Sequence, residues 1–165
     1  TIGGAWKGLR EFAELGYVDG TPKMLGVQAE GAAAIHDVFH GSESPDETAD
    51  TLADSIAVGR PRNTRKAVRA LEESGGTSVV VSDEAILEAE TLLGRTEGIY
   101  TEPAGATALA GVKAAVTEGI IASDETVVTV STGFGLKDSK SAQEATGGVH
   151  RIEPTLDEIR DLFPE

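Results

Sequence analysis

Residues 78–93 read SVVVSDEAILEAETLL, and this stretch decides the class of fold. Ser78 to Val81 is a run rich in β-branched residues, which predicts a buried strand. Asp83 to Leu93 then places apolar residues on one helical face and acids in the first turn, where the helix dipole favours them. A strand followed directly by an amphipathic helix is the unit from which α/β folds are built.

The same alternation of strand and helix extends along the chain in both directions. Helices separated from strands by short polar turns predict βαβ units, and hence an α/β fold with a parallel sheet. No linker is long enough to divide the chain, so residues 1–165 are predicted to form one unit. The expected helices cover residues 5–15, 32–39, 64–73, 83–93, 104–117 and 155–163, and the expected strands cover 23–28, 78–81 and 126–130. A brief extended piece is expected at 99–100, and residues 42–61 are expected to form a loop with one helical turn.

Composition limits the classes of function. The 165 residues carry 28 Asp and Glu against 14 Lys and Arg, a net charge of -14, which argues against nucleic-acid partners because phosphates need cations. The absence of cysteine excludes disulfides, thiolate metal sites and a Cys nucleophile. No apolar run has the roughly 20 residues of a membrane span, so we expect a cytoplasmic protein. The acidic charge is also compatible with a salt-loving source.

The segment from Val130 to Asp138 carries the most chemical information. It follows a predicted strand, and ligands of α/β sheets bind beyond the carboxyl ends of strands. The hydroxyls of Ser131 and Thr132 offer neutral hydrogen-bonding groups, and two glycines permit close backbone approach. The alternative is a plain turn.

Three other groups of residues are weaker candidates. Residues 100–106 (YTEPAGA) place Glu102 at the start of a helix, where it either binds a ligand or satisfies free backbone amides. The basic cluster at 60–66 either grips an anion or balances an acidic surface, and the second interpretation is preferred. His36 and His40 share a helical face but lack a third ligand, so no metal site is predicted.

Taken together, these segments resemble threonine synthase, a family of fold-type II pyridoxal-phosphate enzymes. The resemblance implies a three-layer α/β sandwich with a mostly parallel sheet, similar to the tryptophan synthase β subunit. The matching stretches run in family order to about residue 142. They are 6–9 (WKGL), 22–31 (PKMLGVQAEG), 53–56 (ADSI), 61–63 (PRN), 72–76 (EESGG), 81–84 (VSDE), 102–106 (EPAGA), 132–133 (TG) and 135–138 (GLKD).

The resemblance implies a set of residues that bind the cofactor pyridoxal 5'-phosphate. Thr132 matches the hydroxyl that partners the pyridine nitrogen, with Ser131 as the neighbouring candidate and Gly133 beside it. Glu102 matches the acid near the ring edge. A neutral partner leaves the ring nitrogen largely unprotonated, and the protein orients and tunes the cofactor.

The resemblance also implies the substrate side of the pocket and the reaction. Ala53, Ile56 and Gly59 belong to the backbone segment expected to line that side. The implied reaction converts O-phospho-L-homoserine and water to L-threonine and phosphate. The alternatives are another fold-type II lyase, such as threonine dehydratase or cysteate synthase, or a non-catalytic ligand-binding domain. Family members are often dimers, so a homodimer is a further expectation.

Two departures from the family pattern matter. Phe134 stands where many threonine synthases have His between the two glycines. The cofactor (Schiff-base) lysine of the family lies in an upstream Ser-x-Lys-Asp segment that these residues lack, and Lys7 lies on an amphipathic helix unsuited to that role. We therefore expect residues 1–165 to form a C-terminal portion that holds half of the active site and no catalytic residue, and that is inactive by itself.

Overall fold

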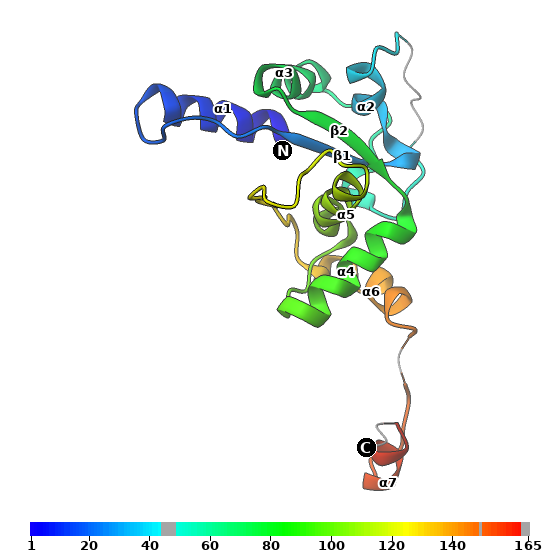
Figure 1. Cartoon of the computed structure of the whole chain (residues 1–165). Coiled ribbons are helices and arrows are strands. Elements are labelled where there is room, and N and C mark those ends of the chain that lie inside the picture. Colours follow the sequence, from blue (N-terminus) through cyan, green and yellow to red (C-terminus); the bar gives the residue numbers. More distant parts are fainter. Residues whose placement is uncertain (44–48, 149, 163–165) are drawn as a thin grey trace.

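The computed structural model describes residues 1–43, 49–148 and 150–162. Helices and strands alternate up to β2, and the described elements after it are all helical (Figure 1). In chain order they are α1 (Ile2–Glu14), β1 (Leu25–Ala29), η1 (Glu30–Ala32), α2 (Ala34–Phe39), η2 (Asp54–Ile56), α3 (Thr64–Ser74), β2 (Thr77–Val81), α4 (Asp83–Glu97), α5 (Pro103–Thr117), η3 (Gly135–Lys137), α6 (Ser139–Ala145) and α7 (Leu156–Leu162).

The sheet of the described part consists of β1 and β2, which run parallel. The register pairs Leu25 with Thr77 and Ala29 with Val81. The crossover between the two strands contains α2 and α3, as a parallel connection requires. The prediction of a parallel α/β fold is therefore confirmed.

Helices cover both faces of this sheet. Figure 1 shows α2 and α3 on one face and α5 on the other, with α4 packed against α5. Each of α2, α3 and α5 contacts both strands. The result is the predicted order of helix, sheet and helix, with α1 extending from the side of α3.

Short-range signals set the helix ends. The Ser82 side chain caps α4 by accepting a hydrogen bond from the Ala85 amide at 3.3 Å. Gly75 and Gly98 end α3 and α4 in the left-handed conformation, with φ of 62° and 66°. Pro103 occupies the first turn of α5, where its missing N–H leaves no hydrogen bond unmade.

Small residues dominate the core between the sheet and the helices α4 and α5. Ile86 is its largest member, and Gly111 lets α5 come close to β1. A β-carbon added at Gly111 would lie 2.2 Å from Cγ2 of Val27. The buried members of this cluster are Ala29, Ala53, Val81, Ile86, Ala89, Ala106 and Ala110.

The strand predicted at 126–130 is wrong. Residues 126–130 form no strand but an exposed coil, in which Val128 is 85% exposed. A strand needs a neighbouring strand for its backbone hydrogen bonds, and within the described residues none lies beside this segment. Residues 99–100, expected to form a brief extended piece, belong to no regular element, and the adjacent Thr101 makes an isolated antiparallel bridge with Phe134.

The remaining predicted boundaries differ little from the structure. The expected helix at 32–39 divides into η1 and α2, and the expected helical turn within 42–61 is η2. Residues 44–48 of that loop and Phe163 at the end of the last predicted helix lie outside the described residues. None of the described helices combines the length and the apolar character needed to cross a membrane.

Candidate functional site

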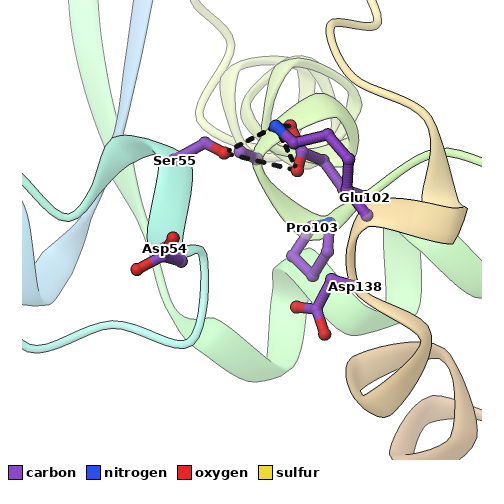
Figure 2. A pocket seen from close by; sticks show the side chains of 7 residues that line it. Asp54, Ser55, Glu102, Pro103 and Asp138 are labelled. Carbon is purple, nitrogen blue, oxygen red and sulfur yellow. Dashed lines mark hydrogen bonds and ion pairs between the residues drawn. The ribbon is translucent and has the colours of Figure 1, made fainter.

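A cavity of about 260 Å³ opens where the start of α5 meets η2 and η3 (Figure 2). Three carboxylates and one ammonium group line it, so its wall is mainly acidic. The lining residues are Asp54, Ser55, Glu102, Pro103, Ala104, Lys137 and Asp138.

A triangle of polar side chains closes one side of this cavity. The Lys137 ammonium donates to both carboxylate oxygens of Glu102, at 3.0 and 2.9 Å, and to Ser55 Oγ at 3.1 Å. The Ser55 hydroxyl in turn lies 3.3 Å from Glu102 Oε2. The Glu102 side chain is 8% exposed, whereas that of Lys137 is 60% exposed. Lys137 therefore neutralises a buried carboxylate while its own stem remains in contact with solvent.

The coil at 131–133 lies directly on the first turn of α5. Thr101, which is 1% exposed, donates to the Gly133 carbonyl at 2.9 Å and accepts from the Ser131 hydroxyl at 2.9 Å. Gly105 allows this approach, since a β-carbon there would lie 2.2 Å from the Thr132 carbonyl oxygen. The Thr132 side chain is exposed, and no side-chain hydrogen bond to it is found in the described part of the chain.

Gly133 is the position in this coil that requires glycine. Its φ of 80° lies in the left-handed region, which disfavours other residues. A β-carbon there would also lie 1.9 Å from Glu102 Oε1. The backbone of the coil and the buried carboxylate of Glu102 are thus in direct contact.

Asp138 borders the cavity and also begins α6. Its carboxylate accepts from the Ser141 amide at 3.1 Å and from the Ser141 hydroxyl at 2.6 Å. The hydroxyl hydrogen bond holds the pKa of Asp138 below its usual range, so this carboxylate stays ionised.

The residues predicted from the sequence occupy two places. Ser131, Gly133 and Glu102 come together around Thr101, as described above, and Thr132 lies in the same coil. The three residues predicted for the substrate side lie elsewhere, and none of them lines the cavity. The 53–59 segment lines the cavity with Asp54 and Ser55 instead. Ala53 is buried in the core, Ile56 packs against the core, and Gly59 is half-buried.

Sequence reasoning missed Ser55 and Lys137 as members of the site. Both lie inside stretches that resemble the family, but the resemblance assigns neither of them a role of its own. A signal was present for Lys137, since it is one of few lysines in an acidic chain and closely follows Gly133 and Gly135. No local pattern marks Ser55, because its partners are 47 and 82 residues away.

The predicted histidine pair lies away from the cavity. Ser78 Oγ is 3.0 Å from His36 Nδ1 and 3.4 Å from His40 Nε2, so both rings face β2. Burial, followed by the neighbouring His40, lowers the pKa of His36. In the described ranges no group of three or more His, Asp or Glu side chains is arranged for a metal ion. The pair ties α2 to the sheet.

Comparison with known proteins identifies the family. The model of the family described as "Pyridoxal-phosphate dependent enzyme" matches residues 1–133, which is most of the chain. The chain belongs to this family. A protein of Methanocaldococcus jannaschii named "Threonine synthase" is 41% identical over 99% of the chain. That alignment covers 41% of the relative, so the chain spans about two fifths of its length.

Solved structures of this pyridoxal-phosphate family share the fold. The processed form of threonine deaminase isoform 2 from Solanum lycopersicum matches with a TM-score of 0.67 at 23% identity, over 88% of this chain and 40% of that one. A second threonine deaminase, from T.th., matches with a TM-score of 0.53 at 26% identity, over 72% of this chain and 40% of that one. These likenesses agree with the predicted fold-type II class.

Proposed function

We propose that this chain is the part of a threonine synthase that holds the ring-nitrogen side of pyridoxal phosphate. The observation that carries the proposal is the 41% identity to a protein of that name across 99% of the chain. The proposed reaction takes O-phospho-L-homoserine and water to L-threonine and phosphate. When bound, the cofactor supplies the electron sink for this chemistry.

The residues present fit the pyridine ring of this cofactor. Thr132 offers an exposed hydroxyl that has no competing side-chain hydrogen bond within the described residues. Ser131 is the less suitable partner, because its hydroxyl already donates to Thr101. Glu102 supplies a buried acid next to Gly133, and its ion pair with Lys137 holds it in place.

In this proposal the chain's residues orient the ring and shape the substrate wall. The cofactor lysine expected from the resemblance is not among residues 1–165. The wall formed by Asp54, Ser55 and Lys137 would face the substrate and keep its reacting end out of water.

The test uses the purified protein that carries this chain, loaded with pyridoxal phosphate. We expect release of phosphate from O-phospho-L-homoserine, together with one L-threonine for each phosphate. Thr132→Asp should lower kcat by about tenfold or more, because a carboxylate favours the protonated ring nitrogen. Thr126→Asp, at an exposed coil position of the same segment, is the matched control and should retain turnover.

Two results would count against the proposal in different ways. Unchanged kcat in Thr132→Asp would remove Thr132 from the ring-nitrogen role while leaving the reaction intact. Formation of 2-oxobutanoate and ammonia from L-threonine, without phosphate release from O-phospho-L-homoserine, would favour a deaminase, the activity named for the T.th. structure.

A further inference from the structure

Glu90 is a buried carboxyl group that the proposed function does not use. It lies on α4, next to the fully buried Ala89 and one turn after the fully buried Ile86. The residue is 5% exposed, and neither of its carboxylate oxygens has a hydrogen-bond partner in the part of the chain that the structure describes. Buried polar groups are almost always partnered, so this one requires an explanation.

Within residues 1–43, 49–148 and 150–162, no cation is found paired with Glu90. Helix α6 packs against α4, and on that side Asp138 is the charged group that acts on Glu90, while Ser141, which is buried, hydrogen-bonds to Asp138. The two lysines of the neighbouring helices have other partners. Lys113 of α5 pairs with Glu88 at 3.5 Å, and Lys140 of α6 pairs with Glu144 of the same helix at 3.7 Å.

An ionised Glu90 would therefore be an unpaired charge between helices. Burial, and secondarily the negative charge of Asp138, raise the pKa of Glu90 above its usual value. Asp138 has the opposite tendency, since Ser141 stabilises its ionised form. The pair is thus arranged for one neutral and one charged carboxyl group.

We propose that Glu90 is a positioning residue. As a protonated acid it lets α6 pack on α4, and this packing holds Lys137 and Asp138 in place at the cavity. Loss of the Glu90 proton weakens the packing and loosens Lys137 and Asp138. The start of α6 is itself part of the cavity lining. Asp138 is both the cap of α6 and a lining residue of the cavity, and Lys137 directly precedes it. The inference concerns the packing of α6 and does not depend on which substrate the cavity takes.

Hydrogen exchange of the wild-type protein tests the proposal. Because the packed state binds the extra proton, packing should weaken as the pH rises above about 4.5, the usual value for Glu. After correction for the intrinsic exchange rate, protection of the amides at 139–145 should fall by up to tenfold per pH unit. It should level off once Glu90 is fully ionised. Constant protection of these amides from pH 4.5 to 8.5 would overturn the proposal.

Two variants assign the effect to Glu90. Glu90→Gln keeps the shape and removes the titration, so its protection at 139–145 should not vary with pH in this interval. Glu97→Gln is the matched control on the same helix, at an exposed position outside the Lys113–Glu88 pair, and it should keep the wild-type slope. A wild-type slope in Glu90→Gln would overturn the proposal. If that variant does not fold, the wild-type profile decides.

Discussion

The approach of α5 to β1 gives the sharpest prediction about stability. Gly111 lies in the interior of α5, where alanine normally stabilises a helix by about 1 kcal/mol relative to glycine. A β-carbon at this position, however, would lie 2.2 and 2.6 Å from the two methyl carbons of Val27. Val27 is β-branched and stiff about χ1, so its methyl groups cannot easily turn away.

The magnitude follows from these two opposing contributions. Overpacking of a core costs about 1–3 kcal/mol, and contact with both methyl groups indicates the upper end. We therefore expect Gly111→Ala to lower the free energy of unfolding by about 2 kcal/mol. Gly94→Ala on α4 is the matched control, because nothing lies within 4 Å of a β-carbon added there. It should raise the free energy of unfolding by about 1 kcal/mol.

Urea unfolding followed by circular dichroism measures both variants. A difference of about 3 kcal/mol between them corresponds to more than a hundredfold in the folding equilibrium. Val27→Ala supplies a second arm, since it removes both methyl groups and should cost about 1–2 kcal/mol by itself. In the double variant with Gly111→Ala the losses should not add, and the coupling free energy should be about 2–3 kcal/mol. Equal stabilities of Gly111→Ala and Gly94→Ala, or additive losses in the double variant, would refute the reasoning.

Three further predictions concern the core, the ion pair and the histidine pair. Ile86→Ala should lower the free energy of unfolding by about 2–5 kcal/mol in urea titrations, because this fully buried side chain leaves a cavity. Lys137→Met should cost about 1–3 kcal/mol by leaving the Glu102 carboxylate buried without its cation, and adding Glu102→Gln should recover part of that loss in thermal unfolding. Since the pKa of His36 is lowered in the folded state, stability should fall as the pH drops below about 6.5, the ordinary value for His. His36→Asn should reduce this dependence between pH 7.5 and 5.5, and an unchanged dependence would contradict the assignment.

Local patterns predicted α1 to α5, α7 and the first two strands well, whereas α6 at Ser139–Ala145 was not predicted. The β-branched run at 78–81 and the amphipathic helix after it contain both the burial signal and the capping serine, so no distant information was needed. The strand predicted at 126–130 is wrong for a physical reason. A run of Val and Thr indicates a preference for extended backbone, but such a segment becomes a strand only when a neighbouring strand accepts its backbone hydrogen bonds.

The candidate site was predictable only in part. Glu102 and the coil at 131–133 lie in recognisable turns, whereas the triangle that holds Glu102 joins residues far apart in the chain. Glu90 was not predicted to be buried, because the apolar residues of this helix already account for its buried face. Its position four residues after Ile86 and three before Leu93 was the available signal.

The close contacts of α5 have a consequence for how this sequence can change over evolutionary time. Gly111 is restricted by a side chain, so a smaller residue at position 27 would make alanine acceptable at 111. We expect positions 27 and 111 to vary together among homologues. Gly105 is restricted by the backbone oxygen of Thr132, which no substitution removes. Position 105 should therefore remain glycine wherever the coil at 131–133 is kept, while position 111 drifts with its partner.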